Sequence, residues 1–229
     1  MGLVYPGIPT PVVDELLSVF PCKYFIETGT YLGATASWAA QRFEKVFTIE
    51  RSEELWAISK NKFKDLGNVD FLLGDSREQL NELVSQINSP TLFWLDAHWS
   101  GGNTYGEGNE CALIGELEVI NTIEQDCFIL IDDARLFMFP PPYPYSPAQW
   151  PTIGEILNLL NKAGRYSVIV NDVIISIPGS ARPKVMQIYQ NLSTELWEKH
   201  LAQIQPPRPA SIISKLEKSV REIVKHAGT

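Results

Sequence analysis

Cysteine, basic residues and long apolar runs are scarce in this 229-residue chain, and each scarcity excludes a class of protein. The three cysteines, Cys22, Cys111 and Cys127, are widely spaced, which excludes a disulfide scaffold or a zinc site. With 19 Lys and Arg against 27 Asp and Glu, the formal net charge is -8, which disfavours a nucleic-acid or anionic-membrane partner. No apolar run approaches the ~18 residues of a membrane span, and a secretory signal is missing. We therefore expect a cytoplasmic protein.

What the chain does contain is a repeating α/β pattern. Hydrophobic residues make up 45% and charged residues 20%, which is typical of a globular domain with a sizeable core. Helix-length stretches separate short, continuously apolar runs, an order that predicts right-handed crossovers and a parallel sheet. The runs cover residues 23–27, 46–50, 69–73, 91–95 and 127–131, and the helical stretches cover 34–43, 53–64, 76–87 and 110–123.

The pattern changes near its end. Apolar runs at 166–170 and 173–177 flank Asn171-Asp172, and so short a link predicts a tight antiparallel hairpin. We expect a Rossmann-like, doubly wound, mostly parallel sheet closed by this hairpin in residues 1–180, followed by a helical C-terminal extension in residues 181–229. An apolar stripe between Ile212 and Val224 in the extension either docks on the chain's own domain or joins two copies in a homodimer.

Ligands of open parallel sheets bind at the carboxyl ends of the strands. The first run leads into the glycine-bearing turn Glu27-Thr28-Gly29-Thr30-Tyr31-Leu32-Gly33. Glu50 follows roughly 20 residues later, where a ribose-binding carboxylate is expected. Asp75 and Ser76 end the third run and could address an adenine edge. Together these residues indicate a nucleoside-containing cofactor, although the turn could be only a turn, Glu50 a solvated strand end and Asp75 only a helix N-cap.

The type of cofactor follows from the turn. The Gly-x-Gly-x-x-Gly phosphate loop is missing, and the carboxylate of Glu27 would repel a pyrophosphate but attract an ammonium or sulfonium group. These residues, with the closing hairpin, resemble a class I S-adenosylmethionine-dependent methyltransferase, except that Tyr31 stands where many members have glycine. The resemblance covers about residues 20–178 and implies a cofactor site made of Glu27, Thr28, Gly29, Thr30, Tyr31, Gly33, Glu50, Arg51, Asp75, Ser76 and Asp96.

A second group of acidic residues follows the fourth and fifth runs. Asp96, Asp132 and Asp133 should converge at one edge of the sheet, and three anions in a small volume need a cation or a raised pKa. Oxygen ligands suit Mg²⁺. By position, the three residues are similar to the metal ligands of O-methyltransferases of the catechol and antibiotic-sugar types. Alternatively, Asp132 and Asp133 accept hydrogen bonds from loop amides, and Asp96 lines the cofactor pocket.

His98 is the candidate base, with Asp96 beside it, because a neutral imidazole can take a proton from a hydroxyl group. The proline-rich, aromatic segment 137–151 is either a lid that presents flat faces to a sugar or phenol-like acceptor, or a satellite hydrophobic cluster. The predicted function is methyl transfer from S-adenosylmethionine to a small-molecule hydroxyl group, assisted by Mg²⁺. The alternatives are a metal-independent O- or N-methyltransferase, a non-catalytic interaction module and, disfavoured by the missing phosphate loop, an NAD-dependent dehydrogenase.

Overall fold

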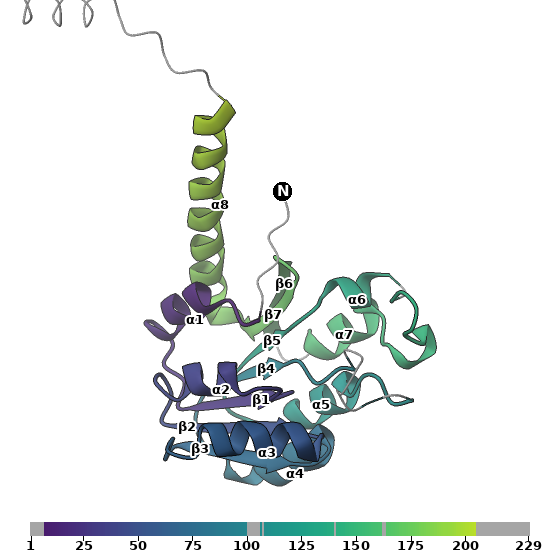
Figure 1. Ribbon diagram of the computed structural model, residues 1–229. Helices are drawn as coiled ribbons and strands as arrows, with labels where there is room; N and C mark the ends of the chain where they lie inside the picture. The colour runs from purple at the N-terminus through teal and green to yellow at the C-terminus, as the bar shows by residue number, and fades with distance from the viewer. Residues whose placement is uncertain (1–6, 100–105, 107, 140, 162–163, 205–229) are drawn as a thin grey trace, which may run out of the picture. The chain divides into compact units, whose positions relative to one another are not determined.

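The computed structural model describes residues 7–99, 106, 108–139, 141–161 and 164–204, and its centre is a seven-stranded sheet (Figure 1). The strand order is β3-β2-β1-β4-β5-β7-β6, with β1 to β5 parallel and β7 antiparallel to both neighbours. The expected sheet with its antiparallel hairpin is thereby confirmed. Its strands are β1 (Tyr24–Thr28), β2 (Lys45–Glu50), β3 (Val69–Leu73), β4 (Thr91–Leu95), β5 (Cys127–Ile131), β6 (Arg165–Val170) and β7 (Val173–Pro178).

Eight α-helices accompany these strands in the part of the chain that the structure describes. They are α1 (Thr10–Leu17), α2 (Ala34–Ala39), α3 (Glu53–Lys62), α4 (Ser76–Leu83), α5 (Leu113–Ile120), α6 (Arg135–Met138), α7 (Ile153–Leu160) and α8 (Arg182–Ile204). Single 3-10 turns follow α4 (Val84–Gln86), precede α7 (Pro147–Gln149) and precede α8 (Gly179–Ala181).

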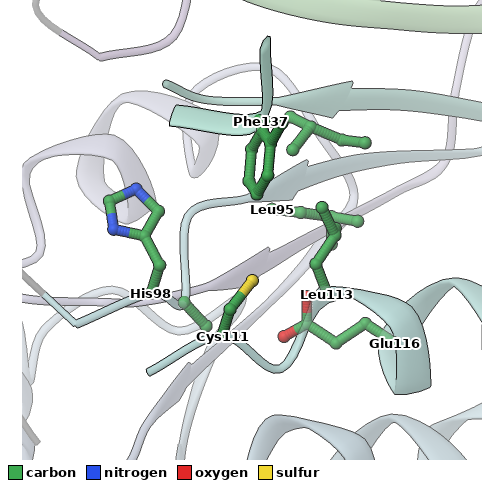
Figure 2. Close-up of a pocket in the computed structure, with 8 residues that line it drawn as sticks. Leu95, His98, Cys111, Leu113, Glu116 and Phe137 are labelled. Atoms are coloured by element: carbon green, nitrogen blue, oxygen red, sulfur yellow. The ribbon is translucent and has the colours of Figure 1, made fainter. Parts of the chain in front are cut away.

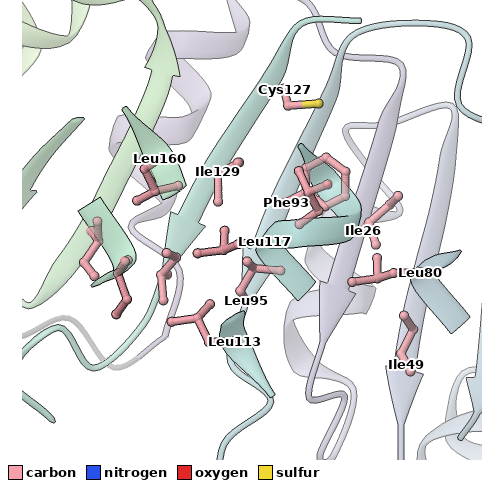
Figure 3. Close-up of a cluster of buried hydrophobic side chains, with 14 of the residues drawn as sticks. Ile26, Ile49, Leu80, Phe93, Leu95, Leu113, Leu117, Cys127, Ile129 and Leu160 are labelled. Carbon is pink, nitrogen blue, oxygen red and sulfur yellow. The ribbon is translucent and has the colours of Figure 1, made fainter. Parts of the chain in front are cut away.

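The main core lies on the sheet face that α4, α5 and α7 cover (Figure 3). Leu80 of α4, Leu117 of α5 and Leu160 of α7 are fully buried against strand residues such as Phe93 and Ile129. On the opposite face, the ring of Phe25 contacts Trp38 of α2 edge-on, with ring centroids 6.1 Å apart. Because both faces are covered, the strands are apolar along their whole length rather than alternating.

The hairpin turn has the geometry that its two residues allow. Asn171 and Asp172 have φ angles of 51° and 70°, and this pair of positive values defines the type I′ turn that suits the right-handed twist of the strands. The turn is also joined to the loop after β5, where Ala134 N donates a 2.8 Å hydrogen bond to Asp172 O and Arg135 N donates to Asp172 Oδ1 at 2.8 Å.

The chain divides into two compact units, Met1–Val185 and Met186–Thr229, and α8 contributes residues to both. The helical character expected after residue 181 is therefore present as far as Ile204, whereas the apolar stripe at 212–224 lies outside the described residues. Among the residues described, no helix combines the length and apolarity that crossing a membrane requires.

Candidate active site

The carboxyl ends of four strands are joined edge to edge by backbone hydrogen bonds. Gly29 N donates to Ile49 O at 2.9 Å, and Asp96 N donates to Thr28 O at 3.0 Å. Asp132 N donates to Leu95 O at 3.1 Å. The pairing of neighbours in the order β2, β1, β4, β5 therefore continues past the ends of the strands. The residues predicted from separate strand ends therefore do share one edge of the sheet.

At two positions of the turn after β1, only glycine avoids both a steric overlap and an unfavourable backbone conformation. Gly29 has φ +88°, and a Cβ atom there would lie 2.5 Å from the backbone oxygen of Asp96. Gly33 has φ +75°, and a Cβ atom there would lie 2.8 Å from the ring of Phe63. Tyr31 also has a positive φ, 48°, and its side chain is exposed. The turn is thus held close to β4 on one side and to the end of α3 on the other.

Glu27 is a buried carboxylic acid at the base of this turn. Its Oε2 accepts a 2.6 Å hydrogen bond from Thr48 Oγ1, which lies 2.6 Å from Thr30 Oγ1. Burial raises the pKa of Glu27 to about 8, and the nearby charge of Asp96 adds to the effect. The site therefore disfavours the anion of Glu27 unless a cation lies nearby.

Glu50 lies where the sequence places it, next to the turn after β1. Its Oε2 accepts a hydrogen bond from Tyr31 N at 2.9 Å, and its Oε1 accepts one from Ser52 N at 2.8 Å. Each carboxylate oxygen can accept about two hydrogen bonds, so one position on each oxygen remains for a ligand such as a ribose hydroxyl group.

Asp75 is the N-cap of α4, the alternative considered above, and its acceptor positions are filled. Arg77 donates to Oδ1 through its backbone N at 3.0 Å and its Nε at 2.8 Å. Arg77 also donates to Oδ2 at 2.7 Å, and Arg51 lies 3.3 Å from the same oxygen. These contacts with Arg77 hold the pKa of Asp75 below its usual value. Three hydrogen bonds from Arg77 and the ion pair with Arg51 occupy both oxygens of Asp75, which leaves little room for an adenine amino group.

His98 lies between two acidic side chains from different strand ends. Its Nε2 is 3.3 Å from Asp96 Oδ1 and 3.1 Å from Asp133 Oδ2. Burial lowers the pKa of His98, but the close carboxylates of Asp133 and Asp96 outweigh it and raise the pKa overall. Burial also raises the pKa of Asp96 to about 7, against the opposing effect of His98. Asp96 and His98 therefore form one coupled proton-binding unit.

The acidic residues expected to hold Mg²⁺ face other partners. Asp133 Oδ1 is 2.6 Å from Arg135, and Asp132 Oδ1 accepts a hydrogen bond from Asp133 N at 2.8 Å. Within the described ranges, no three His, Cys, Asp or Glu side chains are grouped so as to hold a metal ion. The imidazole of His98 stands between Asp96 and Asp133, and Arg135 pairs with Asp133, so side chains of the chain itself occupy the space among these carboxylates and the arrangement does not fit Mg²⁺.

Glu110 connects two segments of the chain, a role that its sequence position does not reveal. Its buried carboxylate accepts hydrogen bonds from Ser146 N at 3.0 Å and from Trp150 Nε1 at 2.6 Å. Its backbone oxygen accepts from Trp99 N at 2.8 Å, next to the His98–Cys111 bridge. Glu110 thereby joins the loop after β4 to the proline-rich segment. Glu110 and Trp150 are 40 residues apart, so no sequence motif indicates that they form a hydrogen bond.

Replacement of Glu110 by alanine should destabilise the protein by about 3 kcal/mol, because the buried indole of Trp150 and the half-buried amide of Ser146 lose their acceptor. Urea unfolding followed by tryptophan fluorescence measures the change. Glu118→Ala, at an exposed position of α5, is the matched control and should change stability by less than about 0.5 kcal/mol. An equal effect of the two substitutions would contradict the connecting role of Glu110.

The aromatic residues of segment 137–151 divide into a packed group and an exposed group. The ring of Trp150 is buried and lies 5.5 Å from His98 and 5.4 Å from Tyr145, centroid to centroid. Tyr143 is 94% exposed and Phe139 is 57% exposed. The segment is therefore a hydrophobic cluster at its Trp150 end, and it presents free aromatic faces elsewhere.

A narrow pocket lies beside His98, between the residues that follow β4 and the start of α5 (Figure 2). Figure 2 shows Glu116 reaching from α5 toward Cys111, with His98 across the pocket. Glu116 is 1% exposed, and burial raises its pKa to about 7 against the opposing effect of the nearby Ser76 and Thr28 hydroxyls. In the sequence, Glu116 is one residue of a predicted helix, and nothing in the pattern distinguishes it from Glu118.

Comparisons with known proteins show a likeness in structure alone. No protein-family model matches the chain, and no curated protein matches it. A Staphylococcus aureus structure assigned as a caffeoyl-CoA O-methyltransferase is 15% identical, with a TM-score of 0.55 over 78% of this chain and 86% of that one. An assigned O-methyltransferase of Klebsiella pneumoniae is 12% identical, with a TM-score of 0.51 over 77% and 83% of the two chains.

A third similar structure is a methyltransferase of Podospora anserina with S-adenosylhomocysteine bound. It is 18% identical, with a TM-score of 0.50 over 75% of this chain and 88% of that one. Likeness at such identities concerns the backbone arrangement. The chain thus has the fold of the class I S-adenosylmethionine-dependent methyltransferases, as its sequence predicted.

Proposed function

We propose that this chain is an S-adenosylmethionine-dependent methyltransferase that methylates a hydroxyl group of a small molecule. The observation that carries the proposal is a pair of acids, buried Glu27 and half-buried Asp96, next to the close contact between Gly29 and the backbone that follows β4. Similar structures from Podospora anserina and Streptococcus mutans hold S-adenosylhomocysteine, which supports the same cofactor here.

The electrostatics of the site favour a cationic ligand over a phosphate. Burial raises the pKa of Glu27 to about 8 and that of Asp96 to about 7, so each anion is unstable where it stands. A sulfonium or ammonium group nearby would stabilise both anions, whereas a pyrophosphate would be repelled by them. Glu50 has acceptor positions left for the ribose hydroxyl groups, in agreement with its expected role.

The chain's own residues would position the acceptor and remove its proton. S-Adenosylmethionine supplies an electrophilic methyl group on sulfur, and the acceptor oxygen displaces the sulfur in line. Asp96 and His98 take the hydroxyl proton as the oxygen–carbon bond forms, and Asp133 and Arg135 hold His98 and its surroundings in place. The rings of Trp99 and Tyr145 contact each other edge-on, with centroids 5.6 Å apart, so a sugar or a phenol would bind on an outward face of this pair rather than between the two rings.

We propose that proton removal proceeds without a divalent ion. The support is the position of His98 between Asp96 and Asp133, because its imidazole occupies the space in which Mg²⁺ would bind these two carboxylates. This departs from the Mg²⁺-assisted mechanism expected from the sequence. Activity measured in EDTA, and again with added Mg²⁺, separates the two mechanisms: equal rates support the proposal, and a rate that depends on Mg²⁺ contradicts it.

Binding of S-adenosylhomocysteine should release protons, and this is the direct test of the cofactor assignment. In the free protein Glu27, with a pKa of about 8, is protonated at pH 7. The ammonium group of the ligand would lower that pKa, so the proton leaves on binding and affinity rises as pH increases from about 6 to 8. Titration calorimetry at pH 7 in two buffers of different ionisation enthalpy measures the release.

Two results of the same calorimetry would favour other functions. Binding of NADH in preference to S-adenosylhomocysteine would indicate the dehydrogenase alternative. Proton-linked binding of S-adenosylhomocysteine, without turnover of S-adenosylmethionine over a broad panel of sugars and phenols, would indicate a non-catalytic module. Glu27→Gln is the matched variant, and it should abolish most of the proton release because its amide does not titrate.

A further inference from the structure

We propose that Glu116, and not Asp75, binds the amino group of the adenine ring, an inference that builds on the proposed cofactor. The sequence resemblance assigns adenine to Asp75 and Ser76. In the structure, side chains of the protein already occupy Asp75, whereas Glu116 has a carboxylate oxygen with no hydrogen-bond partner among the described residues.

Asp75 is already occupied by three hydrogen bonds from Arg77 and an ion pair with Arg51. Each carboxylate oxygen accepts about two hydrogen bonds, and four nitrogen donors from Arg77 and Arg51 surround its two oxygens. To bind adenine, Asp75 would have to release an arginine or uncap α4, and either change costs stability.

Glu116 has the capacity that Asp75 lacks. It is 1% exposed, and among the described residues neither its Oε1 nor the neighbouring Thr28 Oγ1 has a hydrogen-bond partner. A buried acceptor without a donor is costly, and such a group in a native site calls for a ligand or a water molecule. The side chain is carried by the first turns of α5, a rigid element, so its position does not depend on a loop.

The position of Glu116 matches the place that an adenine ring would need. Its carboxylate lies near the hydroxyls of Thr28, which ends β1, and Ser76, which begins α4. It also faces the pocket next to Ala97 and His98 (Figure 2). The pocket is narrow and mostly apolar, so it suits a small substituent such as an amino group rather than a whole ring. A ring lying outside the pocket could point its amino group inward to Oε1.

The test compares S-adenosylhomocysteine with its analogue that carries hydrogen in place of the 6-amino group. The wild-type protein should bind the analogue roughly tenfold more weakly, because the analogue leaves Glu116 unpaired. In Glu116→Leu the two ligands should bind equally, and Glu116→Gln, which keeps an acceptor oxygen, should restore the preference. Glu118→Leu, on the exposed side of the same helix, is the control and should behave as the wild type.

Asp75→Asn provides an independent arm of the test. It should weaken the cap of α4 and lower the unfolding temperature, yet preserve the preference for the amino group. Loss of the preference in Asp75→Asn, or its persistence in Glu116→Leu, overturns the assignment to Glu116, as does a wild-type protein that binds both ligands alike. A wild-type protein that binds neither ligand overturns the proposed function itself.

A purely structural role for Glu116 predicts a different pattern. If Thr28 and Ser76 simply stabilise the carboxylate, Glu116→Leu should unfold more easily and keep the preference of the wild type. If Oε1 is reserved for a ligand, Glu116→Leu should be at least as resistant to heat as the wild type, because an unpaired buried acid is removed. Thermal unfolding in the absence of ligand separates these two patterns.

Discussion

Replacement of His98 by asparagine is expected to lower kcat for methyl transfer by about 10²–10⁴, the usual contribution of a positioned acid–base group. Asp96→Asn should cause a loss of similar size, because the two side chains share a proton and lie 3.3 Å apart. Because His98 also lines the pocket assigned to the adenine amino group, kcat at saturating S-adenosylmethionine reports proton removal, and the affinity for S-adenosylhomocysteine reports any change in the pocket. Steady-state kinetics, together with calorimetry, measure both quantities.

The matched control for His98→Asn is His200→Asn, which makes the same change on α8. The double variant of Asp96 and His98 should lose no more activity than the worse single variant, since residues that act as one unit are not additive. Losses that multiply, or a His98→Asn enzyme with full kcat, would refute the shared role of these residues in proton removal.

The second large effect is expected at Gly29. Alanine there places a Cβ atom 2.5 Å from the backbone oxygen of Asp96, in a backbone conformation with φ +88° that side chains rarely adopt. The strain and the overlap together should lower the free energy of unfolding by about 3 kcal/mol or more. Because the shifted atom belongs to Asp96, cofactor binding should weaken as well. Denaturant unfolding and calorimetry on the folded fraction measure the two effects.

Gly67→Ala is the control for Gly29→Ala, because a Cβ atom at Gly67 would meet nothing within 4 Å. Its stability should stay within about 0.5 kcal/mol of the wild type, or rise slightly through loss of unfolded-chain entropy. A Gly29→Ala protein as stable as Gly67→Ala would mean that the turn after β1 can move away from β4 at little cost.

The strands were the most predictable part of the fold. The bounds of β3, β4 and β5 agree with the sequence prediction to the residue, because continuous apolar runs between helices have few other places in a protein. The turn at Asn171 and Asp172 was equally predictable from the sequence, since these two residue types tolerate positive φ angles. Local chemistry determines both features, and the rest of the chain adds little.

The helices were less predictable. The predicted helix at 110–123 begins only at Leu113, because Glu110 and Cys111 are used to bridge the loop after β4. Helix α7 was missed, although Thr152 and Glu155 form a capping box at its start that is visible in the sequence. The first error comes from tertiary contacts, and the second from overlooking a local signal.

For the site, the sequence identified which side chains come together but not how their charges are distributed. That Asp96, Asp132 and Asp133 share an edge follows from the order of parallel strands. That Arg77 fills the acceptor positions of Asp75, and that His98 takes the position assigned to a metal, depends on long or rotatable side chains. Their positions are set by packing, so no spacing rule reveals them.

The anchoring of segment 137–151 by Glu110 has a consequence for protein engineering. The hydrogen bonds to Ser146 and Trp150 fix the far end of the segment, and buried Phe137 fixes its near end. Phe139 and Tyr143 lie between these two attachments, and because both are exposed they contribute little to the stability of the domain. A library randomised at Phe139 and Tyr143 alone should therefore vary in acceptor choice while nearly all its members still express as folded protein.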